Sequence, residues 1–183
     1  MTDVQNDFAD PGGGLYVSGG EEVVRAMNEE VRRAREAGLL VVYTQDWHPA
    51  STPHFEKDGG VWPVHCVQGS WGAAFHPDLV VDGEVVRKGV GGEDGYSGFT
   101  VRDPTTGEQE GTRLEQVLRS RAVERLVIGG LATDYCVKET VLDARRLGFD
   151  VTVLLGAVRA VDLGPGDGDR AIEAMVAAGA AVV

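Results

Sequence analysis

The fold is decided by the stretch LVIGGLATDYCV, residues 126–137. Its apolar run from Leu126 to Ile128 predicts a buried strand, and the helical spacing that begins near Asp134 continues to Leu147. A strand that leads directly into a helix is the repeating unit of a parallel sheet covered by helices. Cys136 lies at the junction, in the first turn of the expected helix.

The same alternation of helix and strand appears elsewhere in the chain. Apolar residues recur at helical spacing from Glu21 to Ala37, Gly38 follows as a left-handed cap, and Leu39 to Thr44 predicts a strand covered on both faces. Further elements are expected at Val85–Arg87 (strand), Arg113–Arg121 (helix), Val151–Leu155 (strand), Asp169–Ala178 (helix) and Ala180–Val183 (strand). We therefore expect one domain over residues 1–183, a three-layer α/β/α sandwich with a mainly parallel sheet.

Two long irregular stretches follow expected strand ends, one from Asp46 to about Pro77 and the other from Gly89 to Gly111. Sites in folds of this class form beyond the carboxyl ends of the strands. Long loops in a small domain are usually functional. These two stretches are therefore expected to contribute to a functional site.

The composition excludes several classes of partner. The formal net charge of −12 disfavours nucleic acid and anionic membrane surfaces. No apolar run approaches the roughly 20 residues of a membrane span, and the two cysteines, Cys66 and Cys136, have no disulfide-framework spacing. We expect a cytoplasmic protein with neither a nucleic-acid nor a membrane partner.

A cluster of potential metal ligands lies in the first long loop. Asp46 and His48 stand two residues apart, so an extended chain projects both to one side, and His54 and His65 follow. For any one of these histidines alone the role of an ordinary polar loop residue is favoured, but the set favours a metal site. Imidazole with carboxylate suits one divalent transition metal ion, with zinc or iron preferred and manganese as a further option.

Cys136 is the candidate nucleophile. In a first helical turn, with Thr133 or Asp134 as the cap, unpaired amides are expected to lower the thiol pKa and to stabilise an oxyanion. The alternative is a buried cysteine that acts as a small hydrophobe. Because most histidines belong to the metal cluster, the base is expected to be a carboxylate. Asp3 is the candidate with Lys88 as its partner, although spacing alone leaves a solvated surface role open for both.

Six blocks of sequence extend these observations over most of the chain. They are DVQNDF at 3–8, D-x-H at 46–48 with His54, WPVHC at 62–66, RKG at 87–89, GYSGF at 95–99 and GLATDYCV at 130–137. In order and approximate spacing the chain resembles the nicotinamidase (pyrazinamidase) branch of the isochorismatase-like cysteine hydrolases. The four metal-binding positions separate this branch from its metal-free relatives.

The resemblance implies a role for each site residue. It implies a catalytic triad of Asp3, Lys88 and Cys136, and a metal held by Asp46, His48, His54 and His65. It also implies a cis peptide between Leu131 and Ala132, with an oxyanion hole formed by the amides of Ala132 and Cys136. The implied pyridine pocket is lined by Phe8, Trp62 and Tyr96. The expected activity is hydrolysis of nicotinamide to nicotinate and ammonia through a cysteine thioester, a step of NAD salvage. A homo-oligomer is compatible with this expectation.

Two other functions compete with this expectation. The first is hydrolysis of another small amide by the same fold, which includes a metal-free isochorismatase relative. The second is a catalytically silent module that binds nicotinamide without turnover. Metal content together with ammonia release from nicotinamide would distinguish these alternatives.

The N-terminus departs from the family pattern. Members of the family place an apolar strand ahead of the DVQNDF motif, in the middle of the sheet, whereas only Met1 and Thr2 precede Asp3 here. We therefore expect the first central strand to be missing or truncated. Either the true start lies further upstream, which we favour, or the sheet lacks this strand and leaves backbone groups unpaired, at about 1–3 kcal/mol for each buried group.

Overall fold

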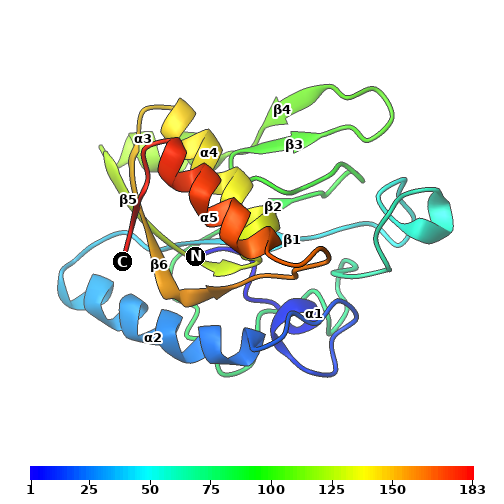
Figure 1. Ribbon diagram of the computed structural model, residues 1–183, viewed down its shortest axis with the longest axis horizontal. Helices are drawn as coiled ribbons and strands as arrows, with labels where there is room; N and C mark the ends of the chain where they lie inside the picture. Colours follow the sequence, from blue (N-terminus) through cyan, green and yellow to red (C-terminus); the bar gives the residue numbers. More distant parts are fainter.

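The structure is a computed structural model that describes residues 1–183 (Figure 1). Its main elements are, in chain order, α1 (Asn6–Ala9), α2 (Gly20–Glu36), β1 (Val42–Asp46), η1 (Glu56–Asp58), β2 (Glu84–Lys88), β3 (Thr100–Arg102), β4 (Gln109–Gly111), α3 (Leu114–Ser120), β5 (Arg125–Leu131), the π-helical turn η2 (Thr133–Val137), α4 (Lys138–Arg146), β6 (Asp150–Arg159), α5 (Asp167–Ala177) and β7 (Ala181–Val182).

The central sheet is parallel and has two halves joined by the N-terminal residues. β1 pairs with β2, and β5 pairs with β6, which pairs with β7. Thr2 forms parallel bridges to Thr44 of β1 and to Gly130 of β5, so it occupies the central position between the halves. The expected parallel sheet is confirmed. Whether a longer strand belongs at this position stays a prediction.

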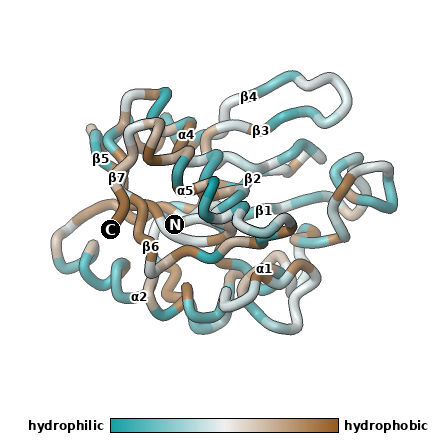
Figure 2. The backbone as a smooth tube through the Cα atoms, in the orientation of Figure 1, coloured by the Kyte–Doolittle hydropathy of each residue, from teal (hydrophilic) through white to brown (hydrophobic).

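Helices cover both faces of the sheet and create two apolar cores, as expected for three layers (Figure 1). The first core lies between α2 and the sheet, and its members include Val23, Met27, Val31, Tyr43, Leu131 and Ala157. The second lies under α3, α4 and α5, and its members include Val86, Leu118, Ile128, Val141, Phe149, Val153 and Met175. In Figure 2, α2 shows apolar and polar patches along its length while β6 is mostly apolar. This pattern explains why one helix face is buried and the other is solvated.

Several element boundaries differ from the sequence-based expectations. The first strand begins at Val42 instead of Leu39, because Leu39 completes the end of α2 by donating its amide to Ala34 and its side chain is 65% exposed. The stretch from Gly89 to Gly111 is not wholly irregular, since it contains the antiparallel β3–β4 hairpin. Gly38 has the expected left-handed conformation, with φ of 66°.

The carboxyl ends of three strands converge on one edge of the sheet. β1 ends at Asp46, β2 ends at Lys88, and β5 ends at Leu131, directly before η2. Asp46 and Lys88 are paired residues in the β1–β2 register. Functional side chains from distant parts of the sequence therefore meet at this edge. None of the helices is long and apolar enough to cross a lipid bilayer.

Gly130 provides a test of how the N-terminal residues are held. Its φ is +130°, and a Cβ at this position would lie 2.0 Å from the backbone oxygen of Thr2. We predict that Gly130→Ala lowers the free energy of unfolding by more than about 2 kcal/mol, because strained backbone alone costs about 1–3 kcal/mol. Urea denaturation measures the change.

Gly156→Ala is the matched control, because a Cβ there meets nothing within 4 Å. Its unfolding free energy should stay within about 1 kcal/mol of the unsubstituted chain. Equal stability of the two variants would contradict the packing of Thr2 against Gly130.

Candidate active site

Cys136 lies in η2, directly beyond the end of β5, and is buried. The residue that precedes the turn is Ala132, which provides no side-chain cap, so the expected capping by Thr133 or Asp134 is wrong. The carboxylate of Asp134 instead accepts the backbone amides of Val161 and Asp162, both at 2.9 Å. These two hydrogen bonds attach η2, the turn that contains Cys136, to the loop that follows β6.

The protonation of the thiol also differs from the expectation. Burial raises the pKa of Cys136 well above its usual value, and the ammonium of Lys88 opposes this rise. The expected lowering of this pKa by the helix terminus is therefore wrong, because desolvation of the thiolate outweighs the favourable charges. Cys136 rests as a neutral thiol, and a nearby base must take its proton before it can attack a substrate.

Asp3 is placed to act on this thiol. Its carboxylate, the Asp46 carboxylate and the Cys136 sulfur lie within 4.8 Å of one another. Asp3 Oδ1 accepts a hydrogen bond from Thr44 Oγ1 at 2.6 Å, and Oδ2 forms an ion pair with Lys88 Nζ at 2.8 Å. Burial raises the pKa of Asp3 while Lys88 opposes the rise. A carboxylate in this environment is a stronger base than one in water.

Lys88 connects the nucleophile to the potential metal ligands. Its fully buried ammonium contacts the carboxylates of Asp3 and Asp46 and the backbone oxygen of Gly95, and it lies 3.7 Å from Cys136 Sγ. Burial alone would lower the pKa of Lys88, but the two carboxylates raise it well above its usual value. Burial of Asp46 acts to raise its pKa, but the positive charge of Lys88 acts in the opposite direction. The net result is a pKa of Asp46 below its usual range. These shifts favour the charged forms of Lys88 and Asp46, whereas the pKa of Asp3 is shifted upward.

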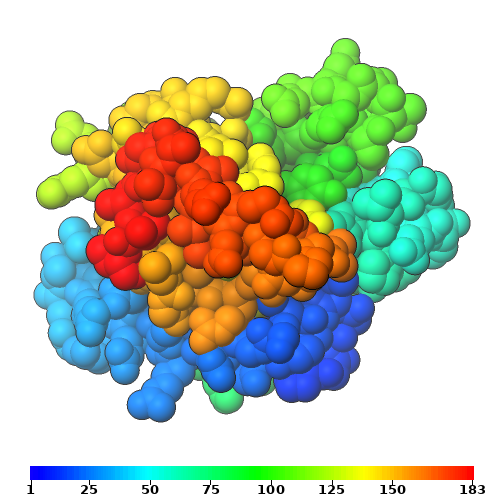
Figure 3. All heavy atoms as spheres, viewed as in Figure 1, coloured from blue at the N-terminus to red at the C-terminus, as the bar shows by residue number.

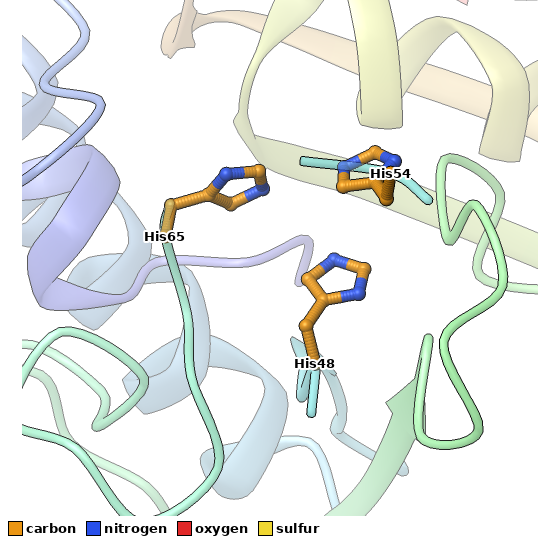
Figure 4. Close-up of side chains that lie close together, drawn as sticks. All are labelled: His48, His54 and His65. Atoms are coloured by element: carbon orange, nitrogen blue, oxygen red, sulfur yellow. The ribbon is translucent and has the colours of Figure 1, made fainter. Parts of the chain in front are cut away.

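His48, His54 and His65 form a buried cage beside this charged group (Figure 4). One nitrogen from each ring lies within 4.8 Å of the other two, and the three rings face a common space. His48 Nε2 lies 3.8 Å from Asp46 Oδ2, which places the expected fourth ligand next to the cage.

The chemistry of these residues fits a divalent metal ion. Both ring nitrogens of His48 are buried without a hydrogen-bond partner, which is costly unless something binds them. Burial lowers the pKa of His65 to about 4, so its ring is neutral at pH 7 and can donate a lone pair. Imidazole nitrogens together with a carboxylate suit a transition metal.

Two of the three cage histidines, His54 and His65, line the same pocket as Cys136. Its wall consists of Phe8, Leu15, Val17, Asp46, His54, Trp62, His65, Gly95, Tyr96, Ala132, Tyr135, Cys136 and Val161. All three expected aromatic residues are in this wall, while Asp3, Lys88 and His48 lie behind it. Trp62 Nε1 donates a hydrogen bond to the hydroxyl of Tyr96 at 2.7 Å. The pocket therefore presents flat aromatic surfaces next to the Cys136 thiol and the cage histidines.

The expected oxyanion hole has partial support in the backbone. The peptide bond between Leu131 and Ala132 is cis, as the resemblance implied. The Ala132 amide donates to no backbone acceptor, so it is free to bind a ligand oxygen. Ala132 and Cys136 both line the pocket.

Other residues at the site were missed by the sequence analysis. Tyr135 packs edge-on against Trp62, with ring centroids 4.8 Å apart, and its position next to Cys136 was the only available signal. The side-chain amide of Gln5 pairs with the backbone of Asp46 as a neighbouring strand would. Its Oε1 accepts a hydrogen bond from the Asp46 amide at 2.7 Å, and its Nε2 donates a hydrogen bond to the Asp46 carbonyl at 2.8 Å. Asp94 hydrogen-bonds to His54 at 2.6 Å. Neither Gln5 nor Asp94 had a sequence neighbour that indicated its partner.

Comparison with known proteins agrees with this geometry. The family model described as the isochorismatase domain matches residues 1–183. The chain is 38% identical to the nicotinamidase of Escherichia coli (strain K12) over 198 residues, which cover 98% of this chain and 91% of that protein.

Two solved structures are similar over the whole chain. The pyrazinamidase of Pyrococcus horikoshii in complex with zinc has 41% identity and a TM-score of 0.89, and the match covers 100% of this chain and 96% of that one. PnC1 from L. infantum in complex with nicotinate has 36% identity and a TM-score of 0.88, and the match covers 100% and 89% of the two chains. The chain therefore belongs to the isochorismatase family and, within it, to the nicotinamidase/pyrazinamidase branch.

Proposed function

We propose that this protein hydrolyses nicotinamide to nicotinate and ammonia, with Cys136 as the nucleophile. The observation that carries the proposal is that a buried thiol, a carboxylate base and a histidine cage meet at one aromatic pocket. The nicotinamidase of E. coli and the nicotinate-bound PnC1 supply the substrate class. A flat pyridine ring matches the surfaces of Trp62 and Tyr96.

The first step is the activation of the thiol. Asp3 takes the proton from Cys136, and the resulting thiolate is stabilised by the ammonium of Lys88, 3.7 Å from the sulfur. The hydrogen bond from Thr44 to Oδ1 of Asp3 leaves Oδ2 as the oxygen that faces Lys88 and can receive the proton. Lys88 keeps its own proton throughout, because two carboxylates surround it.

The second step is acyl transfer. The thiolate forms a bond to the carboxamide carbon, and the developing oxyanion accepts hydrogen bonds from the amides of Ala132 and Cys136. The C–N bond then breaks, and Asp3 returns the proton to the departing nitrogen, which leaves as ammonia. A thioester on Cys136 remains. Water attacks it while Asp3 takes a proton, and the C–S bond breaks to release nicotinate.

The histidine cage orients the substrate in this scheme. Asp46, His48, His54 and His65 would hold a divalent ion, and the zinc complex of the P. horikoshii relative supports zinc as the first candidate. Such an ion would supply a Lewis acid for the pyridine nitrogen. The residues of the pocket wall then exclude bulk water and keep the carboxamide next to Cys136. A cytoplasmic location and a homo-oligomer remain predictions.

Replacement of the nucleophile tests the chemistry. We predict that Cys136→Ala abolishes ammonia release from nicotinamide while zinc binding persists, because position 136 is not a member of the cage. A coupled ammonia assay and metal analysis measure both properties. Cys66→Ala, which removes the other buried thiol, should retain turnover. Ammonia release by Cys136→Ala would refute the assignment, and zinc and nicotinamide binding without turnover in the unsubstituted chain would favour a silent binding module.

Replacement of Asp3 tests whether this residue transfers the proton or only contributes to substrate binding. We predict that Asp3→Asn lowers kcat by about 10²- to 10⁴-fold, the usual contribution of a general base, with little change in KM. Steady-state kinetics with nicotinamide measure both constants. Asp10→Asn is the control, since Asp10 is nearby in sequence and its carboxylate accepts a hydrogen bond only from the amide of Gly12. A kcat within a few-fold of the unsubstituted chain would exclude Asp3 as the base.

Removal of a cage imidazole tests the metal site. We predict that His48→Ala retains less zinc after dialysis, because one of the four ligands and its buried nitrogens are lost. Elemental analysis gives the zinc content per chain. His76→Ala is the matched control, since the ring of this fourth histidine makes one hydrogen bond, which it accepts from the backbone amide of Asp78. Equal zinc content in both variants would argue against the cage.

A further inference from the structure

Asp94 contacts the histidine cage and has no role in the steps above. It lies in the loop after β2, and its Oδ1 is 2.6 Å from Nδ1 of His54. Only 16% of its side chain is exposed, and it forms no other ion pair. Together with Asp46 it is one of two carboxylates in contact with the imidazoles.

The backbone around Asp94 is held firmly by neighbouring segments. Its amide donates to the carbonyl of Arg102 in β3 at 2.7 Å, and the amide of Arg102 donates back at 3.0 Å. Thr52 Oγ1 donates to the carbonyl of Gly92 at 2.5 Å, which ties the loop of His54 to the loop of Asp94. The hairpin and the loop around η1 project on the same side of the molecule (Figure 3).

The hydrogen bond determines which nitrogen of His54 is available. An ionised carboxylate only accepts hydrogen bonds, so Nδ1 of His54 carries the proton and Nε2 keeps its lone pair. His65 is set in the same way, because its Nδ1 lies 2.8 Å from the carbonyl oxygen of Pro63. Two of the three imidazoles are therefore oriented before a ligand arrives.

Asp94 also changes the charge around the cage. Asp46 is shared between the cage and the ammonium of Lys88, which neutralises much of its charge. The carboxylate of Asp94 contacts no lysine or arginine, and its one ring partner is the imidazole of His54. A carboxylate bonded to a ligand imidazole raises the basicity of that ring and strengthens metal binding.

We propose that Asp94 is a positioning residue of the metal centre, which fixes the tautomer and orientation of His54 so that Nε2 faces the ion. The β3–β4 hairpin supports this role by holding the backbone of Asp94. The inference rests on the metal site of the proposed function and extends it to a residue outside the ligand set.

Zinc affinity provides the test, measured by competition with a chromophoric chelator in the absence of nicotinamide. Asp94→Asn keeps the side-chain size and removes the charge, and Asp94→Ala removes the acceptor. We expect the Kd for zinc to rise by about tenfold to a hundredfold for Asp94→Ala and by less for Asp94→Asn. The visible absorption band of the cobalt(II)-loaded protein should shift in both variants, since the field of the His54 ligand changes.

Asp103→Ala is the matched control on the same hairpin. The Asp103 carboxylate accepts the amides of Thr105 and Thr106 at the turn and lies outside the site. Its Kd for zinc and its cobalt spectrum should match those of the unsubstituted chain, even where the melting temperature falls. Unchanged zinc affinity in Asp94→Ala would overturn the inference, and so would equal weakening in Asp103→Ala.

The same assay separates this inference from the proposed function. Because no substrate is present, a failure to hydrolyse nicotinamide leaves the zinc result intact. A lack of zinc binding by the unsubstituted chain would overturn the role of Asp94 together with the metal site, even if hydrolysis persisted.

Discussion

The buried ammonium of Lys88 is the interaction on which the site depends. It lies at the end of β2 and contacts a carboxylate from the N-terminal segment, a carboxylate at the end of β1 and the loop at Gly95. Without the positive charge, Asp3 and Asp46 would be two buried carboxylates in contact with apolar surroundings, which is strongly unfavourable. One cation therefore holds the proposed base and the proposed metal ligand in a single arrangement, with the cysteine sulfur 3.7 Å away.

The sheet holds the side chains of the site in fixed positions. Thr2 bridges β1 and β5, so the next residue, Asp3, starts from a fixed position in the centre of the sheet. Gln5 then bonds to both backbone groups of Asp46 and keeps the end of β1 in place. Preorganised groups lose little entropy when a substrate binds, which is a main source of catalytic rate enhancement. The precision of the pocket thus originates in the parallel strands and not in the loops alone.

Short motifs at strand ends allowed much of the site to be predicted from the sequence. Asp46 ends β1, and His48 and Cys136 come shortly after the ends of β1 and β5, where the hydropathy pattern shows that the strands stop. Asp3 and Lys88 were candidates only, because their ion pair joins residues 85 positions apart and no local spacing reveals it. The resemblance to the family supplied that pairing.

The remaining errors have physical causes that a local pattern does not contain. The thiol pKa of Cys136 was expected to fall because the helix end is visible in the sequence, whereas the burial that raises it depends on tertiary packing. The β3–β4 hairpin was missed because TVR and QEG are short and lack the alternation of apolar residues typical of strands. Asp94 was missed because its partner, His54, is 40 residues away and shares no motif with it.

The central claim is that the cysteine and the histidine cage act on opposite ends of one bound ring. A crystal structure of the zinc-loaded Cys136→Ala variant with nicotinamide, recorded at the zinc absorption edge, tests it most directly. The account predicts zinc among His48, His54, His65 and Asp46, with the ring between Trp62 and Tyr96 and the carboxamide directed at position 136. Zinc outside the cage, or a ring whose carboxamide points away from position 136, would contradict it.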